Sequence, residues 1–335
     1  MSSVNNCFMH SPVAMFVYNR ADNTRRTLEA LMQNKHAEET GVYVFSDGGK
    51  DERSWQKVNE VRNLLHEAER RVAETHALKS LTIVERPENI YLERNIIEGI
   101  GYVLDRHDTV IVLEDDIVTS PYFLDYMNQA FYIYKDDPTV MHVSGFTNLD
   151  HINSEDDEGS EEQENQDDEE FYFTPHMSGW GWGTWAHKWK THFKHFKTRG
   201  EALEGMTRED CNAMQYDGVF PCLKSLDKDP IPWDICWEIA IYKAHGLCLT
   251  PYHTLVRNIG LDSGTHFRGS RWLQHYEFDR EPLNHPIVVT FQTPRKDEKK
   301  EALFKLAIRD WGIRYTWLGK ILRFAYKRYR KLFHK

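Results

Sequence analysis

Three consecutive carboxylates, Glu114, Asp115 and Asp116, directly follow an apolar run at residues 110–113. Such a run, mostly β-branched, is typical of a strand that is buried on both faces in a parallel sheet. Ligands of open α/β sheets bind at the carboxyl ends of the strands. Adjacent carboxylates repel one another unless a cation lies among them, and Mg²⁺ or Mn²⁺ prefers hard oxygen ligands. The sequence therefore predicts a divalent metal site here. A polar turn that caps the following helix is the alternative.

Two further polar turns are expected at the same edge of the sheet. Arg20 lies in the turn after the apolar run 12–18, and Asp47 lies in the turn after the run 42–45. A guanidinium group binds phosphate with two hydrogen bonds, and a carboxylate can accept the ring N–H of a pyrimidine. Together with a metal-binding carboxylate, these turns predict a nucleotide-diphosphate site. Ordinary surface turns remain open for each residue taken singly.

The elements that position these turns alternate between strand and helix over the first 146 residues. Strands are predicted at 12–18, 42–45, 81–85, 110–113 and 140–144, and helices at 24–33, 51–74, 92–105 and 121–134. This alternation predicts a parallel, doubly wound α/β sheet with right-handed crossovers. No G-x-G-x-x-G motif follows the first strand and no P-loop motif occurs, which argues against the dinucleotide-binding and P-loop classes.

Charge and cysteine content exclude other classes. The net charge is −10, but residues 154–170 alone hold eleven acids and no base, which leaves 42 basic against 41 acidic residues elsewhere. The body of the protein is thus near neutral, and no nucleic-acid partner is expected. The acidic run is predicted to be a disordered loop, with calcium or a basic partner as the alternative ligand. Five cysteines without a C-x-x-C pair favour a reducing compartment.

The polar turns belong to a series that resembles a known family. The series resembles the GT-A glycosyltransferases, in particular the inverting N-acetylglucosaminyltransferases of N-glycan branching and O-mannose glycan extension and their bacterial sugar-transferase relatives. It covers roughly residues 12 to 270. Its members, in order, are Asn19-Arg20, Ser46-Asp47-Gly48, residues 113–117 with 121–123 behind them, and residues 179–182.

This resemblance implies a role for each residue of the three turns. Asp116 would bind the divalent metal, Mn²⁺ or Mg²⁺, that bridges the diphosphate of the donor. Glu114 and Asp115 would contact the ribose and the sugar. Arg20 would contact the nucleotide, and Asp47 would read the uracil edge of a UDP-sugar.

Trp180 and Trp182 lie in a stretch, residues 178–185, in which glycine and tryptophan alternate. Glycine lets backbone approach a ligand closely, and indole faces can pack beside it. The related enzymes place a similar element beside the donor, so both residues are candidate donor contacts. Core packing is the alternative, above all for Trp185 and Trp189, whose spacing is helical.

Asp234 is the candidate catalytic base. An inverting transferase needs a group that accepts the proton of the attacking hydroxyl, and the resembling enzymes use an aspartate in a Trp-Asp-rich segment at this point in the chain. Glu238, one helical turn further on, is the reserve. A helix N-cap role for Asp234 remains open.

Two further candidates lie in a predicted flexible loop at residues 256–266. Arg257 is a candidate donor contact, and His266 is a candidate metal ligand or phosphate contact, because similar transferases carry a comparable element. The tail 313–335 holds eight Lys or Arg and no acid, with apolar side chains on one helical face. It is predicted to lie in the plane of an anionic membrane surface or to pack on the catalytic domain.

These inferences divide the chain into four parts: a nucleotide-sugar-binding half at 1–146, an acidic loop at 147–170, an acceptor-side and catalytic half at 171–295, and a basic amphipathic tail at 296–335. No secretory signal or membrane span is apparent, so we expect a cytoplasmic protein that reaches the inner face of a membrane through its tail.

The predicted function is metal-dependent transfer of a sugar, with inversion, from a nucleotide donor to a glycan or lipid-linked acceptor. The donor is expected to be UDP-linked, for example UDP-GlcNAc. A sugar-phosphate nucleotidyltransferase and a noncatalytic carbohydrate-binding protein are the alternatives. The missing glycine-rich basic loop after the first strand counts against the nucleotidyltransferase.

Overall fold

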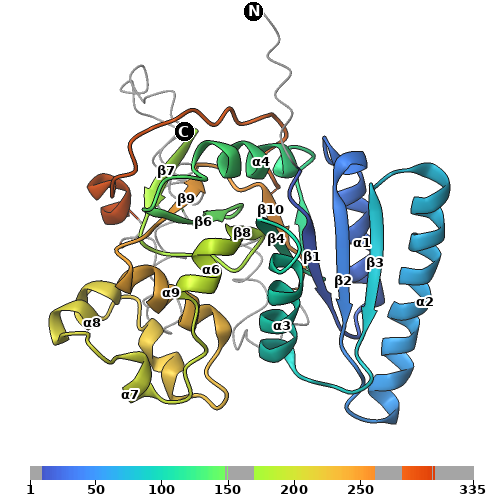
Figure 1. Ribbon diagram of the computed structural model, residues 1–335, viewed down its shortest axis with the longest axis horizontal. Coiled ribbons are helices and arrows are strands. Elements are labelled where there is room, and N and C mark those ends of the chain that lie inside the picture. Colours follow the sequence, from blue (N-terminus) through green and yellow to red (C-terminus); the bar gives the residue numbers. More distant parts are fainter. Residues whose placement is uncertain (1–9, 148, 150–169, 261–280, 304, 306–335) are drawn as a thin grey trace, which may run out of the picture.

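A mixed eight-stranded sheet forms the centre of the protein (Figure 1). The computed structural model describes residues 10–147, 149, 170–260, 281–303 and 305. The strands follow the order β3-β2-β1-β4-β8-β6-β9-β7. Their bounds are β1 Val13–Val17, β2 Gly41–Ser46, β3 Ser80–Glu85, β4 Thr109–Glu114, β6 Val140–Ser144, β7 Phe171–Thr174, β8 Trp182–Trp185 and β9 Leu247–Pro251.

The first four strands confirm the predicted parallel α/β arrangement. β1 pairs in parallel with β2 and β4, and β2 pairs in parallel with β3. The helices between them are α1 Ala21–Met32, α2 Glu52–Thr75 and α3 Leu92–Leu104. α1 begins three residues before the predicted start at Thr24, because the Thr24 amide already donates to the Arg20 carbonyl at 2.9 Å. Asp51 caps α2 by accepting from the Ser54 amide at 2.7 Å.

The prediction of a mostly parallel central sheet is confirmed, and all the antiparallel pairings of this sheet involve β7 or β8. β8 lies antiparallel between β4 and β6, β6 and β9 pair in parallel, and β7 runs antiparallel to β9. Gly183 makes the insertion of β8 possible, because a Cβ atom there would lie 2.5 Å from the Val110 carbonyl oxygen and 2.5 Å from the Phe131 ring. The glycine-tryptophan stretch is thus partly a central strand.

Helices cover both faces of the sheet. Val13 and Met15 of β1 belong to one core cluster with residues of α1, α2 and α4 (Phe123–Ile133). Ala14 and Phe16 point to the opposite face and pack in a second cluster with residues of α3 and α9 (Trp233–Lys243). All five residues of β1 are buried, as expected for a strand between two helical layers. Shorter elements are the helices α6 Ala186–His192, α7 Arg199–Ala202 and α8 Arg208–Met214 and the 3₁₀ turns Ala37–Glu39 and Cys222–Asp227.

A small second sheet lies beside the acidic turn. β5 (Ile117–Thr119) pairs antiparallel with β10 (Val256–Asn258). The prediction of a flexible loop is therefore wrong for residues 256–258, because β10 is held by this pairing. The Ile259 amide also donates to the Asp116 carbonyl at 2.8 Å. This ladder carries Gly260 to the carboxyl end of β4.

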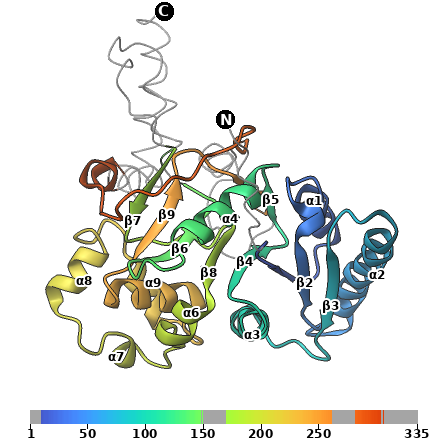
Figure 2. The ribbon, with the colours of Figure 1, turned by 45° about the horizontal axis from the view of Figure 1, so that its top comes forward.

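Residues 281–303 run back across α4 (Figures 1 and 2). The Gln129 side chain of α4 donates to the Ile287 carbonyl and accepts from the Val289 amide, at 3.2 and 3.0 Å. The acidic run up to residue 169 and the basic tail from 306 lie outside the described residues. Among the described residues, no helix combines the length and the apolar character needed to cross a membrane.

Candidate active site

A cavity of about 800 Å³ opens at the carboxyl ends of β1, β2 and β4. The structure brings together all three polar turns singled out in the sequence and places α9 on the same cavity. Its volume is within the range of small-molecule sites, about 300–1,000 Å³. The sequence-predicted residues among its lining are Arg20, Asp47, Glu114, Asp115, Asp116, Trp180 and Asp234.

Arg20 is held by the acidic turn. Its Nη1 lies 2.8 Å from Asp116 Oδ2, its Nε donates to Asp115 Oδ2 at 3.2 Å, and its Nη2 pairs with Asp115 Oδ1. Burial disfavours the charged guanidinium, but the charges of Asp115 and Asp116 outweigh this effect and raise the pKa of Arg20 above its ordinary value. The Thr27 hydroxyl of α1 donates to the Asp115 carbonyl at 2.9 Å. The N-cap residue and the second turn of α1 thus both contact the acidic turn.

Arg20 alone cannot keep all three acids of this turn ionised near neutral pH. Burial, Asp116 and Asp115, in that order, raise the pKa of Glu114 to about 8 against the opposing effect of Arg20. Burial also raises the pKa of Asp115 to about 6, although Arg20 lowers it. One guanidinium therefore faces three carboxylates. An added divalent cation with oxygen ligands fits this donor set, because it would relieve the repulsion among the acids.

Asp47 is fixed at the cavity wall. Its Oδ1 accepts from the Gly48 and Ile90 amides, both at 2.9 Å, and its Oδ2 accepts from Asn89 Nδ2 at 2.9 Å. Gly48 is required here, because a Cβ atom would lie 2.3 Å from the Glu88 carbonyl carbon. The carboxylate is buried, so the turn after β3 sets its direction.

The two tryptophans that were candidate donor contacts lie in different environments. Trp180 lines the cavity and packs edge-on against Phe146, with ring centroids 4.6 Å apart. Trp182 is completely buried between His142 and Trp233, at ring-centroid distances of 5.0 and 5.2 Å. Trp182 thus supports Trp233, which reaches the cavity in its place.

Asp234 and Glu238 both lie on α9, but only Asp234 lines the cavity. Asp234 is exposed in the first turn, lines the cavity, and adds to the raised pKa of Glu114 through its charge. The N-cap residue is Pro232, and Asp234 Oδ1 accepts from the Ile235 amide at 2.7 Å. Glu238 is buried one turn deeper. Its carboxylate accepts from the Met177 amide at 2.9 Å and bonds His176 Nδ1 at 2.5 Å, away from the cavity lining.

The last two candidates lie elsewhere. Arg257 lies on β10, where its guanidinium pairs with Glu281, and the cavity lining does not include it. His266 lies outside the described residues. From this part of the chain, Asn258 and Gly260 reach the cavity instead. A Cβ atom on Gly260 would lie 2.0 Å from Asp116 Oδ2, so β10 brings its backbone directly against the proposed metal ligand.

Sequence reasoning missed several lining residues. Asn89 and Asn95 follow β3 and could have been found by extending the strand-end argument to the third strand. Lys228 and Ser225 lie near a 3₁₀ turn, and no motif marks them. Among the missed polar and aromatic lining residues are Lys50, Asn89, Tyr91, Asn95, Ser225 and Lys228.

The sheet, the acidic turn after β4 and the arginine and aspartate turns beside it form the arrangement expected of a nucleotide-sugar glycosyltransferase of the GT-A class. The family model described as "GNT-I family" matches residues 2–194, more than half of the chain. The chain belongs to the GNT-I family. This membership favours the glycosyltransferase over the nucleotidyltransferase and the noncatalytic carbohydrate-binding protein.

Similarity to individual proteins is distant. The mannosyltransferase PcManGT from Pyrobaculum calidifontis, solved with GDP-Man and Mn²⁺, is 15% identical, with a TM-score of 0.39 over 70% of this chain and 69% of that one. S. aureus TarS 1–349, solved with UDP-GlcNAc, is 16% identical, with a TM-score of 0.29 over 40% of this chain and 33% of that one. A search of curated proteins finds no match.

Proposed function

We propose that the protein transfers a sugar from a UDP-linked donor, such as UDP-GlcNAc, to a hydroxyl group of a glycan or lipid-linked saccharide, with inversion at the anomeric carbon. One observation carries this proposal: the acidic turn after β4 and the exposed Asp234 face the same cavity. An inverting transfer requires a group that binds the diphosphate and a carboxylate that can reach the acceptor hydroxyl.

The donor would lie along the carboxyl edge of β1, β2 and β4. Asp47, fixed by three hydrogen bonds, would accept the ring N–H of uracil. Arg20 pairs with Asp115 and Asp116 through three of its five N–H groups and would contact the nucleotide with the remaining two. Asp116, supported by Asp115, would hold a Mn²⁺ or Mg²⁺ ion, which when bound offsets the negative charge of the departing diphosphate.

Asp234 would act on the acceptor. The hydroxyl oxygen forms a bond to the anomeric carbon as the bond between that carbon and the diphosphate oxygen breaks, and Asp234 takes the hydroxyl proton. The nucleoside diphosphate leaves with the bonding electron pair. An ordinary aspartate, with a pKa near about 3.9, is a weak base, so position within hydrogen-bond reach matters more than basicity.

The acceptor would enter over the aromatic side of the cavity. Trp180 and Trp233 line this side and offer flat apolar surfaces to a sugar ring. A lipid-linked acceptor agrees with the basic, amphipathic tail, which we propose lies on the inner face of an anionic membrane.

The test is an Asp234→Asn variant assayed for UDP release from UDP-sugars with millimolar Mn²⁺ and a panel of saccharide acceptors. Donor binding, measured by calorimetry, should be unchanged, and turnover should fall by roughly 10²–10⁴-fold, as for a lost general base. Asp227→Asn is the matched control, because Asp227 is also exposed and lies outside the cavity lining. Full turnover in Asp234→Asn would contradict the assignment.

A further inference from the structure

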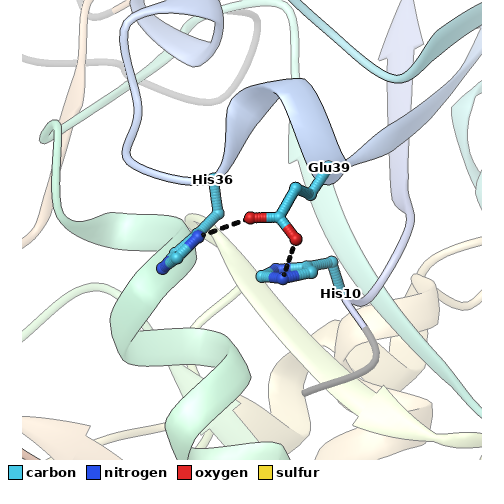
Figure 3. Close-up of side chains that lie close together, drawn as sticks. All are labelled: His10, His36 and Glu39. Carbon is cyan, nitrogen blue, oxygen red and sulfur yellow. Dashed lines mark hydrogen bonds and ion pairs between the residues drawn. The ribbon is translucent and has the colours of Figure 1, made fainter. Parts of the chain in front are cut away.

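Two histidines and a glutamate meet at the edge of the sheet opposite the cavity (Figure 3). His10 precedes β1, and His36 and Glu39 precede β2, so all three lie at the amino ends of parallel strands. His10 Nε2 lies 2.8 Å from Glu39 Oε2, and His36 Nδ1 lies 3.0 Å from Glu39 Oε1. One carboxylate therefore joins two imidazoles.

The second nitrogen of His36 also faces a carboxylate. His36 Nε2 lies 3.3 Å from Asp125 Oδ1, and the other oxygen of Asp125 pairs with Lys35 Nζ at 2.9 Å. A neutral imidazole has only one N–H, so it can donate to one of its two carboxylates but not to both. Donation to Asp125 leaves the Nδ1 lone pair directed at Glu39. A proton or a metal ion is needed between these two atoms.

We propose that His10, His36 and Glu39 bind a zinc ion, with Asp125 as the outer partner that orients His36. One nitrogen or oxygen atom from each of the three ligands lies within 4.8 Å of the others. Ligand atoms at about 2.0–2.2 Å from a tetrahedral zinc ion stand about 3.3–3.6 Å apart, so the widest pair of these atoms would have to close by up to about 1.5 Å. Metal-bound histidines usually donate their other N–H to a carboxylate, as His36 can to Asp125.

The donor set distinguishes this site from the cavity. Two imidazoles and one carboxylate suit zinc, whereas the acidic turn after β4 offers only hard oxygen ligands that suit Mn²⁺ or Mg²⁺. Three protein ligands leave a fourth zinc position for water. Glu39 is exposed, so an ion can reach the site from solvent. The bound ion would tie the start of β1 to the turn before β2, which is a stabilising role distinct from the transfer reaction.

The test measures Zn²⁺ affinity of the full chain by competition with a chromogenic chelator. His36→Gln should lose the site, and Asp125→Asn should weaken it by roughly 10–100-fold, as for an outer partner. His66→Gln is the matched control. His66 also contacts two glutamates, at 2.8 and 3.5 Å, but it does not belong to the cluster of His10, His36 and Glu39. Its Zn²⁺ affinity should equal that of the wild type.

X-ray absorption of the zinc-loaded wild-type protein gives a second measurement that does not depend on how a variant folds. Two imidazoles and oxygen ligands in the first shell support the proposal. A sulfur ligand, or a shell of oxygen alone, overturns it. Equal Zn²⁺ affinity in His36→Gln and wild type also overturns it and leaves only a metal-free hydrogen-bonded cluster. None of these outcomes bears on the transfer reaction.

Discussion

Asp116 lies where the carboxyl ends of β1 and β4, the proposed donor site, meet the small sheet of β5 and β10. Its carboxylate pairs with Arg20 at 2.8 Å, its carbonyl accepts from the Ile259 amide at 2.8 Å, and the Gly260 backbone packs against it. Two chain segments that are far apart in the sequence therefore fix one proposed metal ligand. Such positioning keeps an oxygen ligand in place before the ion arrives.

Asp116→Ala is expected to abolish the metal-dependent part of donor binding, because it removes the proposed ligand. The dissociation constant of UDP-GlcNAc, measured by calorimetry with and without Mn²⁺, should become the same under both conditions. Asp22→Ala, on the exposed side of α1, is the control and should retain the difference. A full Mn²⁺ effect in Asp116→Ala would remove this residue from the site.

Gly260→Ala tests the contact between Gly260 and Asp116 by changing the glycine instead of the carboxylate. The added Cβ atom would lie 2.0 Å from Asp116 Oδ2 and 2.9 Å from Arg20 Nη1, so the carboxylate or β10 must move. Mn²⁺-dependent donor binding should weaken while the circular dichroism spectrum stays that of the wild type. Gly101→Ala in α3 is the control, since nothing lies within 4 Å of its added Cβ atom. It should bind donor normally and gain stability of about 1 kcal/mol.

At the scale of elements, α9 shows what residue spacing can and cannot predict. Residues four apart share a helix face, so Asp234 and Glu238 were both predicted to reach the site. The spacing indicates the helix face on which each side chain lies but not how deeply the side chain is buried. Asp234 is exposed in the first turn of the helix, whereas Glu238 is buried beneath residues 176–177. Depth depends on a loop from elsewhere in the chain.

The same contrast holds for the strands. β1 to β4 were predictable because each is an apolar run bounded by polar turns, and their shared direction placed three turns at one edge. β8 was not predictable, because a run of glycine and tryptophan has no strand periodicity of its own. Its partners β4 and β6 are strands from elsewhere in the chain, and Trp182 is buried for the same reason.

Glu238→Gln separates an anchoring role from a catalytic one. As an anchor, Glu238 holds His176 and the Met177 amide just before the cavity residues 178–180. Replacing the charged acceptor should lower the free energy of unfolding by about 1–3 kcal/mol, measured by urea denaturation. Turnover lowered by roughly 10²–10⁴-fold at unchanged stability would instead identify Glu238 as the base.

At the scale of the whole molecule, a buried lysine links α6 to the start of β6. Lys188 Nζ donates to the Asp137 carbonyl at 2.7 Å and to the Val140 carbonyl, and it lies 3.9 Å from the centre of the Trp185 ring. Burial lowers the pKa of Lys188 to about 8, although Asp137 and Asp136 raise it. The stability of the protein should therefore depend on pH in the alkaline range.

The sign of this dependence follows from proton linkage. The unfolded chain keeps the ordinary lysine pKa of 10.5, so between pH 8 and 10.5 it binds more protons than the folded protein, and stability contributed by this group rises with pH. One pKa unit corresponds to about 1.4 kcal/mol. Relative to Lys188→Met, the wild type should gain on the order of 3 kcal/mol across this range, measured by urea denaturation at each pH. Parallel pH profiles would contradict the assignment.

The antiparallel insertion of β8 also sets an order of events in folding. β4 carries the acidic turn, but its second neighbour in the sheet is made only when residues 182–185 leave the ribosome. Until then β4 presents an open edge of unpaired backbone groups, and β6 has no strand pairing that joins it to the first four strands. The proposed nucleotide-sugar-binding half, residues 1–146, thus cannot complete the pairing of β4 during its own synthesis. β4, which carries the proposed metal ligand, gains its second neighbour only from the half that carries the proposed base.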